Sequence, residues 1–298
     1  MSDACVKLTR HRAVSVVPIH GWRAVLFGLP FVACGAGLVI YAVAGGRSIK
    51  APPELLVLAG CAFAVMGGLL LVHGMCGAAR ERRVRAAQAW QPNEPWAWDY
   101  DWDSRGIDAL GARAPARWIK FCGAAALLLA PFHLAAFDAE HNALVLPLWV
   151  AICDLGLLIA AAYAARLAVQ RRKFGSPRLS FGHFPFRAGE VLEVYLEGVR
   201  GLEHLDRLDC SLRFIEERYE ATGHNGAYEV NSYQLYCDER SLETRMSGPV
   251  HLRFQLPRNG LATRLSDRPP RYWELALQGE AKGLDFAASF LLPIYEKA

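Results

Sequence analysis

Two groups of residues in this chain have the types and spacing that recognition or proton chemistry requires. The first is the Trp-rich segment, residues 90–107, where indole rings alternate with carboxylates. The second consists of three polar side chains inside or near apolar runs, Asp154, His133 and His73. Indoles fill pockets on protein partners, carboxylates pair with Arg or Lys, and an acid within a membrane marks an ion path or a helix contact. The candidate interaction residues of the segment are Trp90, Trp96, Trp98, Asp99, Tyr100, Asp101, Trp102 and Asp103.

The Trp-rich segment has two interpretations. Its prolines favour an irregular chain over a strand, although its aromatic and acidic residues alternate. Tryptophan is typical of membrane interfaces, so one role is an anchor at the level of the lipid headgroups. Anionic headgroups would repel Asp99, Asp101 and Asp103, whereas a protein surface offers Arg and Lys to them. We therefore expect the segment to dock against a protein, in the first place against residues 174–298 of its own chain.

Asp154 is the only acid inside an apolar run, and it lies near the middle of residues 144–170. An ionised carboxylate there is unfavourable by several kcal/mol unless it is paired or hydrated. One interpretation is a neutral or hydrogen-bonded Asp154 that fixes helix packing, and the other is an Asp154 on the path of a small transporter. We favour the first because the chain has no obvious inverted repeat. His73 and His133 are interpreted as packed or interfacial residues.

Known catalytic and metal-binding motifs are absent from the sequence. It contains no GxSxG, GxxxxGK[ST], HExxH or full GxGxxG. The eight cysteines form no CxxC pair. The histidines near the C-terminus lack the spacing of metal ligands. We therefore expect no catalytic, metal-binding or cofactor-binding residues and no enzymatic activity.

Four apolar runs are each long enough to cross ~30 Å of hydrocarbon at ~1.5 Å per residue. The first is too long for the core of a signal peptide and continues past Cys34, so we interpret it as an uncleaved helix. The runs divide the chain into a leader (1–21), a transmembrane hairpin (22–79), a connection (80–117), a second hairpin (118–170) and a C-terminal domain (171–298). The four helices are expected at 22–46, 55–79, 118–137 and 144–170.

Small residues recur in the second run at Gly60, Ala64 and Gly68. This spacing predicts a helix face that another helix can approach closely. The neighbour is either another helix of the chain or a second copy, so small-residue faces also allow a homo-oligomer.

The distribution of Lys and Arg predicts the orientation of the spans. Four lie in the leader up to Arg23, eight in 80–120 and five in 166–178, against two in the first turn on the other side. Both termini are therefore expected in the cytoplasm of a bacterial inner membrane, with anionic lipid beside the basic clusters. Residues 171–298 hold 18 basic and 18 acidic side chains, and this balance argues against a nucleic-acid partner.

From Pro177 onward the apolar residues alternate with polar ones at period two. The pattern predicts about seven short strands in an antiparallel β-sandwich. Residues 273–277 are expected to pair with 286–290 across a turn, and a phase slip predicts a bulge near Asn231 and Ser232. The fold class is thus four transmembrane helices plus a C-terminal all-β domain.

Two stretches resemble a known family. Residues 272–295, YWELALQGEAKGLDFAASFLLPIY, resemble the closing hairpin of bacterial arrestin-like sandwiches. Residues 94–102, EPWAWDYDW, are similar to a Pro-Trp-x-Trp-x-x-Asp-Trp box of uncharacterised bacterial inner-membrane proteins. In that box a basic residue usually follows the second Trp, where this chain has Asp99. The resemblance implies helices followed by an immunoglobulin- or arrestin-like sandwich, and it implies no catalytic residues.

These features together predict a multi-pass inner-membrane protein that presents a cytosolic β-sandwich for protein–protein interaction. Its role would be that of a scaffold, an accessory subunit or an assembly factor, with the lipid bilayer and a protein as partners. The alternative is a small transporter, or a subunit of one, that uses Asp154.

Overall fold

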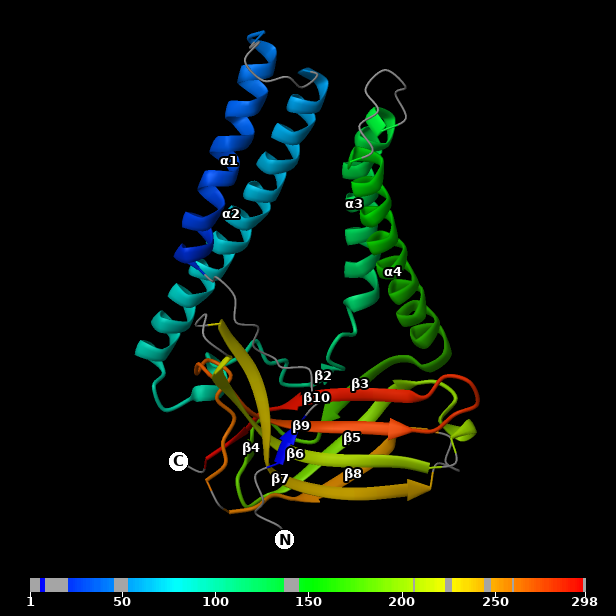
Figure 1. Ribbon diagram of the computed structural model, residues 1–298. Coiled ribbons are helices and arrows are strands. Elements are labelled where there is room, and N and C mark those ends of the chain that lie inside the picture. Colours follow the sequence, from blue (N-terminus) through cyan, green and yellow to red (C-terminus); the bar gives the residue numbers. More distant parts are fainter. Residues whose placement is uncertain are drawn as a thin grey trace. The chain divides into compact units, whose positions relative to one another are not determined.

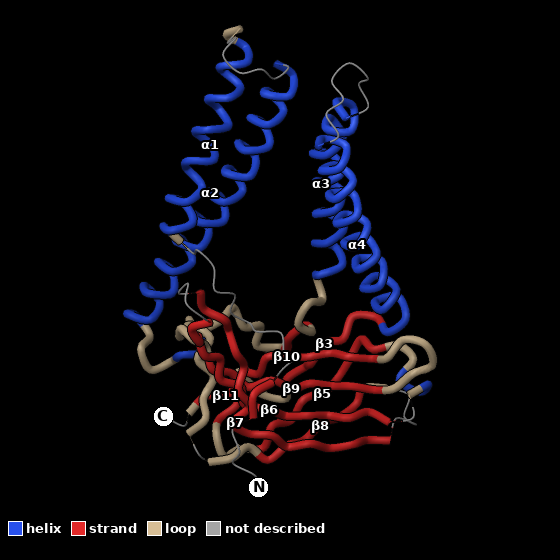
Figure 2. The backbone as a smooth tube through the Cα atoms, in the orientation of Figure 1, coloured by secondary structure: helices blue, strands red, loops and turns tan. Residues whose placement is uncertain are grey.

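The computed structural model describes residues 6–8, 21–45, 53–136, 145–205, 207–222, 227–243, 248–258 and 260–296. These residues form helices and β-sheets that are mainly antiparallel (Figure 1, Figure 2). The chain divides into two compact units. The helical unit takes in Pro18–Arg85 and Arg113–Leu167, and the β unit takes in Met1–Val17, Ala86–Ala112 and Ala168–Ala298.

The predicted apolar runs lie on four helices. They are α1 (Trp22–Val43), α2 (Pro53–Trp90), α3 (Ala114–Ala136) and α4 (Val145–Phe174). Among the described residues, three helical stretches are long and apolar enough to cross a membrane, Trp22–Val43, Leu56–Trp90 and Pro147–Phe174. The chain therefore has the composition of a membrane protein. Helix α2 continues past the predicted span to Trp90, so the basic residues that follow the span are helical.

Helices α1 and α2 pack through glycines that recur at every seventh residue. A Cβ atom at Gly35 would lie 2.5 Å from the carbonyl oxygen of Gly60, and one at Gly67 would lie 2.8 Å from that of Gly28. The absence of side chains therefore lets the two backbones approach closely. The sequence pattern was wrong about Gly68, where a Cβ atom would meet nothing within 4 Å. The stripe follows a seven-residue repeat, which is typical of two helices that coil around each other.

The β unit contains strands drawn from three separate parts of the chain. They are β1 (Val6–Leu8), β2 (Gly106–Asp108), β3 (Gly175–Phe181), β4 (Phe186–Arg187), β5 (Val191–Val199), β6 (Arg207–Thr222), β7 (Ala227–Glu243), β8 (Val250–Gln255), β9 (Arg271–Gly279), β10 (Phe286–Leu292) and β11 (Ile294–Tyr295). A five-stranded sheet has the order β1-β7-β6-β9-β10, and a four-stranded sheet has the order β2-β3-β5-β8. Strands β4 and β11 form a short parallel pair.

One hydrophobic core joins the two larger sheets. On β6, the predicted inward residues Leu208, Cys210, Leu212 and Phe214 are at most 2% exposed. Apolar residues of β5, β8, β9 and β10 belong to the same cluster. The alternation that the sequence predicted for these strands is therefore confirmed, because one face of each strand packs into this core.

The expected hairpin of β9 and β10 is present, with Leu275 opposite Phe290 (Figure 1). The expected bulge in β7 lies elsewhere. Two adjacent residues of β6 pair with Tyr236 and Gln234, which leaves Leu235 as the extra residue. The sequence pattern placed the bulge too early in β7. Asn231 and Ser232 are buried, at 8% and 3% exposure, but because they are polar they interrupt the apolar alternation where the strand pairs regularly.

The last turn of α4 is fixed to the β unit. The ammonium group of Lys173 donates hydrogen bonds to the carbonyl oxygens of Lys282 and Leu284, at 3.0 and 2.7 Å. Next to it, the ring of Phe174 packs edge-on against Phe286, with 5.4 Å between the ring centroids. The last residues of α4 therefore belong to the β unit, which takes up the chain again at Ala168.

Candidate interaction site

The Trp-rich segment is built into the β unit. After α2 it forms a 3-10 turn at Pro95–Ala97 and an irregular stretch, as its prolines predict, and it ends in β2. Strand β2 extends the four-stranded sheet, with Ile107 opposite Leu179. A Cβ atom at Gly106 would lie 2.2 Å from the carbonyl oxygen of Leu179, so only glycine allows this approach. The predicted docking of the segment on residues 174–298 is thus present in the structure.

Asp99 is the buried polar centre of this contact, at 4% exposure. Its carboxylate accepts hydrogen bonds from the backbone N–H groups of Leu265, at 3.0 Å, and Ser266, at 2.7 Å. It also accepts one from the hydroxyl of Tyr295, at 3.2 Å. Donors in these numbers satisfy a buried carboxylate, which would otherwise be strongly unfavourable.

Tyr295 connects Asp99 to the indoles of the segment. Its hydroxyl donates to Asp99 and accepts from Nε1 of Trp102, at 2.8 Å. Burial, together with the charge of Asp99, raises the pKa of Tyr295, so the hydroxyl keeps its proton. The Trp96 ring packs edge-on against the Tyr295 ring, with 6.0 Å between the centroids. The guanidinium of Arg187 lies 5.1 Å from the centroid of the Trp96 ring. Trp96 is therefore held between an aromatic edge and a cation.

A small hydrophobic cluster forms beneath the segment. Ile215, Tyr272 and Leu291 are at most 1% exposed, and they come from β6, β9 and β10. The partly buried residues packed on them are Leu8, Tyr100, Trp102, Ile107 and Leu265. The leader, the connection and the C-terminal part of the chain therefore share one apolar contact.

Asp103 and Asp108 hold the end of the segment through Arg178 of β3. The guanidinium of Arg178 donates to Asp103 at 2.6 Å and to Asp108 at 3.0 Å. The backbone N–H of Arg105 also donates to Asp103, at 3.0 Å. The hydrogen bonds from Arg105 and Arg178 lower the pKa of Asp103.

Not all predicted residues join the contact. Trp90 is 87% exposed at the end of α2, and Asp101 is exposed as well. Trp98 donates its indole N–H to the carbonyl oxygen of Gln91, at 3.0 Å, and so closes the turn after the helix. Arg178 and Tyr295 were not predicted, because no local pattern distinguishes them from other strand residues.

The intramembrane candidates form a second arrangement. Nε2 of His133 on α3 lies 2.9 Å from Oδ2 of Asp154 on α4, and Nδ1 lies 2.9 Å from the carbonyl oxygen of Leu129. A carbonyl oxygen only accepts, so Nδ1 carries a proton. One further proton then lies between Nε2 and Oδ2, and the pair is neutral overall wherever that proton resides. Asp154 is thus hydrogen-bonded, as the packing interpretation expects, while His73 is exposed on α2.

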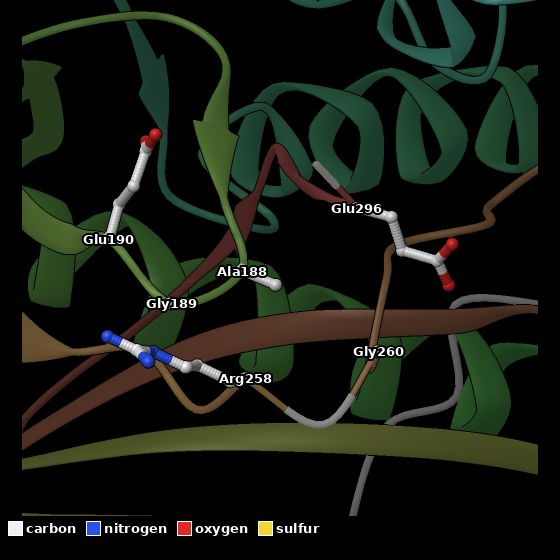
Figure 3. A pocket seen from close by; sticks show the side chains of 6 residues that line it. All are labelled: Ala188, Gly189, Glu190, Arg258, Gly260 and Glu296. Carbon is white, nitrogen blue, oxygen red and sulfur yellow. The ribbon is translucent and has the colours of Figure 1, made fainter. Parts of the chain in front are cut away.

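A surface depression of about 600 Å³ lies beside β4 and is drawn in Figure 3. It is lined by Ala188, Gly189, Glu190, Arg258, Gly260 and Glu296. The carboxylates of Glu190 and Glu296 point in different directions, and the side chain of Arg258 runs close to Gly189.

The described residues contain no group of three or more His, Cys, Asp or Glu side chains that could hold a metal ion. The hydrogen bonds around Asp99, Trp102 and Tyr295 join distant segments of one chain. No model of a known protein family matches the chain, and no curated protein matches it either.

Proposed function

We propose that the protein is a four-span inner-membrane protein whose cytosolic β-sandwich, immunoglobulin- or arrestin-like, binds a protein partner in a scaffold, accessory or assembly role. The observation that carries the proposal is the burial of Asp99. It ties the connection between α2 and α3 to the domain that follows α4. A segment held by several hydrogen bonds is preorganised, and a preorganised surface loses less entropy when it binds.

The strand pairing supports an even number of membrane crossings. Strands β1 and β2 belong to the same unit, although α1 and α2 lie between them in the chain. Strands β2 and β3 also belong to this unit, although α3 and α4 lie between them. If α4 crosses the membrane, α3 must cross it too, to return the chain to the same side. Helix α3 has 23 residues, which is enough for the ~20 that a span needs.

Reporter fusions test the orientation that the Lys and Arg distribution predicts. Alkaline phosphatase is active only outside the cytoplasm. Fused after Ala298 in a bacterial host, it should be inactive, and fused within residues 138–142 it should be active. Strong activity of the fusion after Ala298 would overturn the cytosolic assignment.

The outer face of β5 and β8 offers a surface for a partner. The ring of Tyr195 stacks on His251, with 4.8 Å between centroids, and Tyr195 is 38% exposed. Beside them Arg253 pairs with Glu193, at 3.3 Å. An exposed aromatic group bordered by charges is the composition of an interface hot spot with a polar rim.

Photo-crosslinking in native membranes tests the interaction role. A photoreactive amino acid at Tyr195 of the full chain should give a discrete protein adduct, which should weaken in an Asp99→Ala background. The same label at Trp90, which is exposed on the helix end, is the control position. The proposal fails if the label at Tyr195 yields no adduct above that control.

The transporter alternative depends on one observation, the proton shared by His133 and Asp154. It requires proton flux through reconstituted protein, measured with a pH-sensitive dye inside liposomes. Asp154→Asn should abolish such flux. Equal dye responses from the wild type and from empty liposomes would leave the pair with a packing role alone.

A further inference from the structure

Among the described residues, the outer edge of β7 is paired over only a short part of its length. Strand β7 has 17 residues, and in the sheets of the described residues its neighbours are β6 on one side and β1 on the other. Strand β1 pairs with it at three positions, which run from Gln234 to Ser232. A long edge with so short a neighbour is an available template for another strand.

The contacts of β1 indicate which strands the edge accepts. The ammonium group of Lys7 lies 3.4 Å from Oε2 of Glu220, a residue of β6 that projects beside β7. Asn231 donates to the same oxygen at 2.5 Å, and the hydroxyl of Tyr233 donates to Oε1. These donors, with Tyr233 the strongest, lower the pKa of Glu220, so it presents a fixed negative charge. On the other face of β1, Leu8 packs on the small cluster that also holds Trp102.

We propose that the outer edge of β7 is a strand-addition site, and that β1 is a resident occupant that a partner protein displaces. The partner supplies an extended segment with a Lys or Arg between two apolar residues. Its cation meets Glu220, one apolar side chain takes the place of Leu8, and its main chain continues along β7 where β1 ends. Such strand addition takes affinity from main-chain hydrogen bonds and specificity from alternate side chains. The inference rests on the proposed interaction role and names the kind of partner.

The lengths of the two strands favour exchange. Within the described part of the chain, the three residues of β1 form few of the hydrogen bonds that the 17 residues of β7 offer. A partner segment of six or more residues forms more of them. The resident strand has the advantage of its tether, which gives it an effective concentration of the order of mM. A partner therefore binds weakly while β1 is seated and more tightly once β1 is removed.

A peptide-binding experiment on the full chain in nanodiscs tests the site. The probe is a fluorescent peptide with the sequence of residues 4–10 and Ser in place of Cys5. Its anisotropy should report binding at least tenfold tighter to a variant that lacks residues 2–12 than to the wild type. A probe with Lys7→Glu should bind at least fivefold more weakly, and a Glu220→Lys protein should prefer that probe. Glu243→Lys, an exposed acid at the end of β7, is the control with the same change of charge.

Three outcomes would overturn the proposal. The first is equal affinity of the probe for the wild type and for the variant without residues 2–12. The second is equal affinity of the Lys and Glu probes for that variant. The third is a wild-type dimer that dissociates when residues 2–12 are removed, because the occupant would then be a second copy. The crosslinks at Tyr195 do not involve this edge, so they test the interaction role separately.

Discussion

Asp99 and Tyr295 are 196 residues apart in the chain, and a hydrogen bond of 3.2 Å joins them. One residue lies between two helices, and the other lies in the last strand, β11. The bond closes the β unit around a segment that hydropathy alone would assign to a loop. Its partners Leu265 and Ser266 contribute backbone N–H groups, so the contact depends on the acid rather than on a matching side chain.

Asp99→Ala should destabilise the β unit. It leaves the buried hydroxyl of Tyr295 and the half-buried N–H groups of Leu265 and Ser266 without this acceptor, and a fully buried group so left costs about 1–3 kcal/mol. We expect a loss of about 2–4 kcal/mol in the free energy of unfolding and a red shift of tryptophan emission, since Trp102 loses its apolar surroundings. Asp101→Ala, at an exposed position, is the control. Equal denaturation midpoints for the two variants would contradict the role of Asp99.

The β unit should lose stability in acid. The pKa of Asp103 is lowered by hydrogen bonds from Arg105 and Arg178, so its folded value lies below its unfolded value. Its contribution is therefore complete above the unfolded pKa, about 3.9, and is lost as the pH falls through the folded pKa. Thermal midpoints measured between pH 6 and pH 2 should fall less steeply for Asp103→Asn than for the wild type. An identical slope would show that the ion pair with Arg178 contributes nothing.

Neighbouring glycines of α2 should respond in opposite ways to the same change. Gly67→Ala places a Cβ atom 2.8 Å from the carbonyl oxygen of Gly28, so the helices must separate, at about 1–3 kcal/mol. Gly68→Ala meets no atom and gains up to ~1 kcal/mol of helix propensity. Thermal stability of the full chain in detergent is the measurement. A loss at Gly68 larger than the loss at Gly67 would refute the packing of α1 on α2.

Substitutions at Asp154 should separate charge from packing. Asn retains a side-chain group that can donate to Nε2 of His133, so Asp154→Asn should change stability by less than ~0.6 kcal/mol, the mean for hydrogen bonds in membranes. Leu cannot bond to the ring and leaves a polar nitrogen unpaired, so Asp154→Leu should cause a larger loss. Steric trapping or detergent denaturation of the full chain measures both. Equal stability of the Leu and Asn variants would show that the bond does not fix the helices.

The Trp-rich segment should be required for a stable soluble β unit. The guanidinium of Arg171 donates to the carbonyl oxygen of Ala112, at 3.2 Å, so a short Gly/Ser linker can replace the two helices between these residues. Residues 86–112 joined in this way to 171–298 should melt at least ~10 °C above residues 171–298 alone, because the latter expose the small cluster. Equal melting temperatures would show that the segment adds no stability.

The spacing of apolar residues predicted the helices and several of the strands. The helices, the inward phase of β6 and the hairpin of β9 with β10 each follow from spacing along a few residues. The docking of the Trp-rich segment was predictable from a conflict of charge, because carboxylates next to indoles are poorly placed at anionic lipid. These inferences needed no knowledge of distant residues.

Long-range choices could not be predicted. Asp99, Asp101 and Asp103 look equivalent in the sequence, and only the direction of two backbone N–H groups near residue 265 distinguishes Asp99. Likewise Gly67 and Gly68 are equally small, and the coiling of α1 around α2 decides which one is in contact. The strand at Val6–Leu8 was not predicted, because three residues carry too little pattern.

The three-part origin of the β unit has a consequence for the order of synthesis. The N-terminal strand β1 leaves the ribosome first, but its neighbour β7 follows only after all the helices have been made. Strand β2 likewise waits for β3. The unit therefore closes only after the helices have been translated. Its closure requires that β1, β2 and β3 lie on one side of any membrane that the helices cross.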